Sequence, residues 1–165
     1  MAQTKLGENT VNTLGDLPAI GSTAPDFTLT GNDLKEVKLN DFKGKKIVLN
    51  IFPSVDTGVC ATSVREFNKR ASALDNTVVL CISKDLPFAF RRFCGAEGID
   101  KVVTLSDFKN KGFSKDYGME MIDGGMAGFF ARSIAVLDEN GKVKYTEIVP
   151  AVGQEPNYDA ALKAL

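Results

Sequence analysis

Two apolar runs that flank an amphipathic stretch constrain the fold of this chain more than any other feature. Residues 46–52 (K-I-V-L-N-I-F) and 77–82 (T-V-V-L-C-I) are almost wholly apolar and rich in β-branched side chains, as expected for strands buried on both faces. Between them, apolar residues recur in alternating steps of four and three, the spacing of a helix with one apolar side. These residues are Cys60, Val64, Phe67, Ala71 and Leu74. A strand, a helix and a strand in this order predict a right-handed crossover with parallel pairing.

Similar patterns predict further elements before and after this unit. They are a hairpin within residues 4–14, a helix over about 86–95, a short strand at 102–105, strands at 133–137 and 143–149, and a last helix from about 156 onward. In the helix over 86–95, we expect Leu86, Phe90 and Phe93 to face inward. Asn140-Gly141, between the two later strands, is a strong signal for a tight antiparallel turn.

The order of these elements defines the expected fold class. A βαβ unit followed by a ββα unit is typical of an α/β, thioredoxin-like fold, here with an added N-terminal β-hairpin. No internal repeat, low-complexity tract or long linker interrupts the sequence, so we expect residues 1–165 to form a single domain. A chain of 165 residues can bury roughly 70% of the surface that its unfolded form exposes.

The charge balance excludes several classes of partner. The chain has 20 Lys and Arg against 21 Asp and Glu, so it lacks the positive excess that binds nucleic acid or an anionic membrane. Nowhere do about 18 consecutive apolar residues occur, and residues 1–20 do not resemble a signal peptide. We therefore expect a cytoplasmic protein whose three cysteines are thiols rather than parts of a stable disulfide framework.

Cys60 is the principal candidate for chemistry. It follows the strand that ends at Phe52 by one short loop, at the expected start of a helix, where Thr57 occupies the N-cap position. The chain contains no histidine, so fixed charge rather than an imidazole base has to activate this thiol. The partial positive charge of a helix N-terminus stabilises a thiolate. A reactive cysteine without histidine points to peroxide chemistry.

The helix terminus alone is too weak for this task. Shifting a thiol pKa from about 8.5 to about 6 takes about 3.4 kcal/mol, whereas a helix terminus supplies about 0.3 to 1 kcal/mol, and at best about 2. A cation has to contribute, and Arg132 is the best candidate because it opens the apolar strand at 133–137 after the glycine-rich stretch 124–128. A partly buried guanidinium needs an anion beside it. The other four arginines lie in expected helices among polar residues.

These residues match a known family. Pro53, Thr57 and Cys60 form the P-x-x-x-T-x-x-C signature of peroxiredoxins, and residues 24–27 resemble their A-P-D-F segment. The runs over 50–61 and 91–98 resemble the thiol peroxidases, which are atypical two-cysteine peroxiredoxins. The likeness covers nearly the whole chain, including the N-terminal hairpin, and implies a thioredoxin-like fold of the peroxiredoxin type.

The resemblance also implies a role for each signature residue. Cys60 would be the peroxidatic cysteine, which attacks the O–O bond of a hydroperoxide and becomes a sulfenic acid. Thr57 would hydrogen-bond the thiolate and orient the peroxide. Arg132 would stabilise the thiolate and the charge that develops on the departing oxygen, and Pro53 would shield the thiolate from water.

Cys94 would be the resolving cysteine of the same chain. By resemblance it would form an intramolecular disulfide with Cys60, which thioredoxin would then reduce, and the protein would be a homodimer. If the two cysteines begin on different helices, their Cα atoms can lie beyond the limit of about 7 Å for a disulfide. Local unwinding around both would then belong to each turnover. No cofactor or metal is expected.

Part of the glycine-rich loop departs from the family pattern. Gly125 stands where proline is frequent, and Phe129 and Phe130 stand where smaller aliphatic residues are usual. Because the family uses this loop to wall the substrate pocket, the two aromatic residues would bias the enzyme toward apolar hydroperoxides.

Simpler structural roles remain open for several of these residues. Thr57 could serve only as a helix cap, and Cys94, beside an aromatic residue, could be a core thiol. Cys81 lies inside the apolar strand at 77–82, where packing explains it well enough. The glycines of 124–128 could simply permit a turn.

Other classes of protein fit the sequence less well. The missing histidine excludes a Cys-His hydrolase, three cysteines without paired spacing make a poor zinc site, and a disulfide reductase would need a C-x-x-C pair. The remaining alternative is a thioredoxin-fold interaction module whose cysteines only pack. That alternative predicts a protein that peroxide leaves unchanged.

Overall fold

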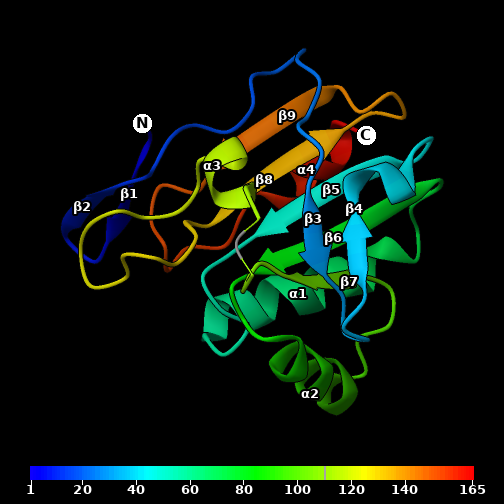
Figure 1. The fold of residues 1–165 in the computed structure, drawn as a ribbon, viewed down its shortest axis with the longest axis horizontal. Coiled ribbons are helices and arrows are strands. Elements are labelled where there is room, and N and C mark those ends of the chain that lie inside the picture. The colour runs from blue at the N-terminus through cyan, green and yellow to red at the C-terminus, as the bar shows by residue number, and fades with distance from the viewer. Residues whose placement is uncertain (110) are drawn as a thin grey trace.

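The computed structural model describes residues 1–109 and 111–165 and has an α/β architecture (Figure 1). The strands are β1 (Gln3–Leu6), β2 (Asn9–Asn12), β3 (Thr28–Thr30), β4 (Glu36–Lys38), β5 (Lys46–Ile51), β6 (Thr77–Ser83), β7 (Val103–Ser106), β8 (Ser133–Leu137) and β9 (Val143–Ile148). The helices are the 3₁₀ turn η1 (Leu39–Phe42), α1 (Gly58–Ala71), α2 (Pro87–Glu97), α3 (Phe113–Tyr117) and α4 (Tyr158–Lys163).

A mixed sheet with the order β4-β3-β7-β6-β5-β8-β9 forms the centre of the molecule. β5, β6 and β7 are parallel, while β8 and β9 extend the sheet antiparallel on one side and β3 and β4 do so on the other. β5 pairs with β6 from Lys46↔Thr77 to Ile51↔Ile82, with α1 as the crossover between them. The predicted βαβ unit and the thioredoxin-like fold are confirmed.

Each face of the sheet carries its own apolar cluster. Alternate residues of β5 belong to opposite clusters, with Ile47, Leu49 and Ile51 on one face and Val48 on the other. The cluster on the face with Val48 also contains buried residues of α1, α2 and α4, which are Val64, Phe67, Phe90, Phe93 and Ala161. The continuous apolar run of β5 therefore reflects burial on both faces, as predicted.

The predicted N-terminal hairpin is confirmed as a separate two-stranded sheet. β1 and β2 pair antiparallel with Lys5 opposite Thr10. The hairpin docks through a parallel bridge to the segment after β9, where the Lys5 amide donates to the Pro150 carbonyl and the Lys5 carbonyl accepts from Val152, both at 2.9 Å. The hydroxyl of Thr4 donates to the carbonyl of Val149 at 2.9 Å.

One packing prediction is wrong, and several short elements were not predicted. Leu86 is 49% exposed because it lies at the N-cap of α2, whereas Pro87 after it is buried. α1 ends at Ala71, so Leu74 follows the helix but still packs against its cluster. The unpredicted elements are β3, β4, η1 and α3. Each spans only three to five residues, too few to show a hydrophobic period.

Among residues 1–109 and 111–165, no helix combines the length and the apolar character needed to cross a membrane.

Candidate active site

Cys60 lies at the carboxyl edge of the central strands, in the first turn of α1. This turn begins after the loop that follows β5, as expected for ligand sites in sheets of this kind. The side chain is 0% exposed and packs in a cluster with Phe52 and Val55. Arg132, immediately before β8, donates a hydrogen bond from Nη2 to the Cys60 Sγ at 3.2 Å. The pairing of β5 with β8 brings these two positions together.

The guanidinium of Arg132 is almost completely buried. The residue is 1% exposed, and its Nε donates to the carbonyl of Val152 at 3.0 Å. Its Nη1 is buried without a hydrogen-bond partner, and no carboxylate forms an ion pair with it among the described residues. A buried donor without an acceptor is costly. An oxygen atom that binds beside the sulfur could accept a hydrogen bond from this nitrogen and remove that cost.

Thr57 occupies the N-cap position of α1 but does not cap it with its side chain. The side chain is exposed, and its hydroxyl donates to the carbonyl of Ser54 at 3.1 Å. This geometry differs both from a simple cap and from a bond to the Cys60 sulfur. Because the hydroxyl donates to Ser54, the lone pairs of the Thr57 oxygen remain free to accept a hydrogen bond. Pro53 is buried in the same loop, between β5 and Ser54.

Cys94 lies on α2, so the two cysteines of the expected pair begin on different helices. All three cysteines of the chain are free thiols. The Sγ of Cys94 is 3.7 Å from the Oγ1 of Thr104 and 4.0 Å from the Nδ2 of Asn32. Half-buried, it borders a surface hollow of about 370 Å³. Cys60 is fully buried against Arg132, whereas Cys94 borders this hollow, so the two sulfurs have separate surroundings.

Cys81 behaves as the packing interpretation predicted. It is 0% exposed within β6, and its sulfur accepts a hydrogen bond from the Nδ2 of Asn50 at 3.7 Å. Burial raises the pKa of Cys81 to about 12, so this thiol stays protonated near neutral pH.

The glycine-rich loop forms turns, and one of its aromatic residues lies elsewhere than expected. Gly124 and Gly128 have φ values of +76° and +95°, which favour glycine. Phe130 is 0% exposed and meets Phe113 edge to face at 5.5 Å, in the cluster on the sheet face opposite to α1. The expectation that Phe130 walls a substrate pocket is therefore wrong, because the core takes up its ring. Phe129 is 42% exposed.

Asp85 is a residue of this region that sequence analysis missed. It follows β6, and its carboxylate accepts hydrogen bonds from the Ser54 hydroxyl and the Val55 amide, both at 2.7 Å. Asp85 lies outside the family signature, but a signal for it exists. The polar run 83–85 follows a buried strand parallel to β5, and the carboxyl ends of parallel strands meet at one edge.

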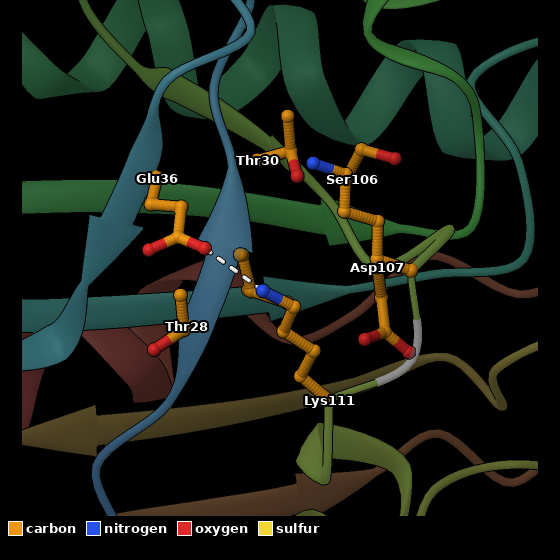
Figure 2. A pocket seen from close by; sticks show the side chains of 8 residues that line it. Thr28, Thr30, Glu36, Ser106, Asp107 and Lys111 are labelled. Carbon is orange, nitrogen blue, oxygen red and sulfur yellow. Dashed lines mark hydrogen bonds and ion pairs between the residues drawn. The ribbon is translucent and has the colours of Figure 1, made fainter.

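A second, separate pocket lies where β3 and β4 meet the end of β7 (Figure 2). An ion pair of 2.8 Å joins Lys111 to Glu36 at this pocket, whose volume of about 10 Å³ suits a single water molecule. Asp107, 2% exposed, lines it, and burial raises the pKa of this carboxyl to about 6. None of the residues predicted for the active site lines this pocket.

The fold and the Cys60–Arg132 contact define the class as a thioredoxin-like protein with a thiol beside a buried guanidinium. Comparison with known proteins agrees, since the Redoxin family model matches residues 19–162. Thiol peroxidases from Mycobacterium tuberculosis (strain ATCC 25618 / H37Rv) and Corynebacterium glutamicum are 58% and 54% identical over 165 residues, which is 100% of this chain and 99% of each relative. A solved peroxiredoxin-like protein from Aquifex aeolicus has a TM-score of 0.92 and 34% identity, covering 98% of this chain and 95% of that chain.

The chain belongs to the peroxiredoxin family and, within it, to the thiol peroxidases.

Proposed function

We propose that this chain reduces hydrogen peroxide and alkyl hydroperoxides through Cys60 and recovers through a disulfide with Cys94. The observation that carries the proposal is the 3.2 Å contact between the Arg132 Nη2 and the Cys60 Sγ. Both groups are buried, and Arg132 has no carboxylate partner among the described residues. A thiolate on Cys60 is the anion that such a buried cation needs.

In the first step, the Cys60 thiolate attacks the outer oxygen of the hydroperoxide. A sulfur–oxygen bond forms and the O–O bond breaks, so sulfur becomes a sulfenic acid while the departing alkoxide or hydroxide takes up a proton. The unpartnered Nη1 of Arg132 is suited to donate to the oxygen on which negative charge develops. The Thr57 oxygen would accept a hydrogen bond from the hydroperoxide O–H group. The Thr57 hydroxyl could donate to the thiolate only if it left the Ser54 carbonyl. Buried Pro53 would keep water away.

In the second step, the Cys94 thiol displaces water from the sulfenic acid and forms the intramolecular disulfide. Because Cys60 and Cys94 lie in different helices, the first turn of α1 and part of α2 would have to unwind. The dithiol of thioredoxin would then reduce the disulfide and become oxidised itself. The thiol peroxidase resemblance supports this reductant, a homodimer and a cytoplasmic setting.

The cysteine variants test the proposal. We expect the reduced wild-type chain to consume peroxide stoichiometrically without a reductant, and Cys60→Ser to consume none. Cys94→Ser should give a sulfenic acid that a trapping reagent captures, while turnover with thioredoxin fails. Cys81→Ser is the matched control, because a buried and protonated thiol should not react. Mass spectrometry and peroxide assays measure these outcomes.

Two results would contradict the proposal. Unimpaired multiple turnover by Cys94→Ser would remove Cys94 from the mechanism. Wild-type thiols that peroxide leaves unchanged would favour the interaction module, in which the cysteines only pack.

A further inference from the structure

The Asp85 carboxylate holds the loop that precedes α1. Its Oδ1 accepts from the Ser54 hydroxyl and its Oδ2 accepts from the Val55 amide. Oδ2 also accepts from the hydroxyl of Ser83, while the Asp85 carbonyl accepts from the hydroxyl of Ser106. Asp85 therefore links the loop after β5 to the ends of β6 and β7. Hydrogen bonds to an ionised carboxylate are the stronger kind.

From Ser54 the connection continues to the start of α1. The Ser54 carbonyl accepts from both the amide and the hydroxyl of Thr57, each at 3.1 Å. The Thr57 carbonyl in turn accepts from the amide of Ala61, next to Cys60. The orientation of Thr57 and of the first turn of α1 therefore depends on a serine that Asp85 fixes.

Asp85 also lies two residues before α2, the helix that carries Cys94. A second tie between the same two segments is the ion pair of 2.8 Å between Arg92 and Asp56. Both side chains of that pair are more than 60% exposed, so the ion pair contributes little free energy to holding the two segments together. Asp85 is thus the stronger link between the peroxidatic loop, residues 53–57, and the start of the resolving helix.

We propose that Asp85 is a positioning residue with opposite effects on the two half-reactions. It holds the peroxidatic loop in the shape that attacks peroxide, and it has to release that loop before Cys94 can reach Cys60. The inference rests on the proposed function. It predicts that weakening the Asp85 contacts slows sulfenic acid formation and speeds disulfide formation, which a purely structural role would not do.

Asp85→Asn tests the inference, because the amide replaces one of the two acceptor oxygens with an NH₂ group that cannot accept, and it removes the charge that strengthens these hydrogen bonds. In the Cys94→Ser background, stopped-flow measurement should show sulfenic acid formation slowed about 10-fold or more, equivalent to about 1.4 kcal/mol. In the chain with both cysteines, disulfide formation from the sulfenic acid should be several-fold faster. Ser54→Ala removes one of the contacts. It should also slow sulfenic acid formation and speed disulfide formation, with a smaller change in each rate.

The exposed Asp75→Asn is the matched control and should leave both rates unchanged. If Asp85→Asn does not fold, as judged by circular dichroism, Ser54→Ala decides the question. Equal slowing of both half-reactions, or no change in either while the wild type is active, would overturn the inference alone. A wild-type chain that consumed no peroxide would overturn the proposed function as well, so the two failures are distinguishable.

Discussion

The Arg132 guanidinium is buried, where a positive charge is costly. Only two hydrogen bonds fix its orientation among the described residues. The Val152 carbonyl and the Cys60 sulfur each accept one hydrogen bond from the guanidinium, and Nη1 has no acceptor in the part of the chain that the structure describes. Sequence alone pointed to Arg132, because a charge that opens an apolar strand is unusual. It did not reveal the Thr57–Ser54 bond, and it marked Asp85 only as part of a polar run after a buried strand. The contacts of both residues depend on how the loops meet at the sheet edge.

Arg132→Met should slow the reaction with peroxide by about 10- to 100-fold near neutral pH, since hydrogen bonds to charged groups are worth about 1.5 to 3 kcal/mol. Arg132→Lys keeps the charge but loses the planar fork, so its rate should be intermediate. Stopped-flow rates near neutral pH measure this. An unchanged rate in Arg132→Met would assign the role to another cation.

At the scale of elements, the periodic segments were predictable, and so were the short N-terminal hairpin and β7, whereas β3, β4, η1 and α3 were not. β5, α1 and β6 each bury a regular pattern, and the Asn140-Gly141 turn marks the β8–β9 hairpin. β3, in contrast, owes its place to pairing with β4 and β7, a contact that three residues cannot encode locally. The start of α1 was placed correctly at Thr57, but the role of its side chain depended on Ser54.

The two helix starts of α1 and α4 give a direct comparison. Asn157 caps α4 by accepting from the Ala160 amide at 3.0 Å, whereas Thr57 makes no such bond. We expect Asn157→Ala to lower the free energy of unfolding by about 1 kcal/mol and Thr57→Ala by less than about 0.5 kcal/mol. Urea unfolding of both variants measures the difference. Equal losses would mean that Thr57 does cap its helix in solution.

Among residues 1–109 and 111–165 few charged side chains are buried, and Asp107, at the pocket of Figure 2, is one of them. Its Oδ1 is buried without a partner. Its carboxyl has a pKa of about 6 when folded, against an ordinary value of 3.8. Between these values the folded state keeps a proton that the unfolded state has lost. Asp107 therefore lowers stability as pH rises from about 4 to 6, by at most about 3 kcal/mol.

Asp107→Asn should remove this loss and raise the free energy of unfolding at pH 7.5 by about 1 to 3 kcal/mol. At pH 4.5 the variant and wild type should differ much less. Several exposed carboxyls, such as Glu36 and Glu97, have lowered pKa values and act in the opposite direction, so the difference between variant and wild type is the quantity to measure. The exposed Asp100→Asn is the control. A constant difference across pH would contradict the prediction.

The docking of the N-terminal hairpin has a consequence for how the chain acquires its reactivity. The Val152 carbonyl orients Arg132, and the Val152 amide is bound by the Lys5 carbonyl. The guanidinium is thus anchored by a contact between positions that are nearly a whole chain length apart in sequence. A chain whose hairpin has not yet docked therefore lacks one of the contacts that orient the guanidinium beside the sulfur.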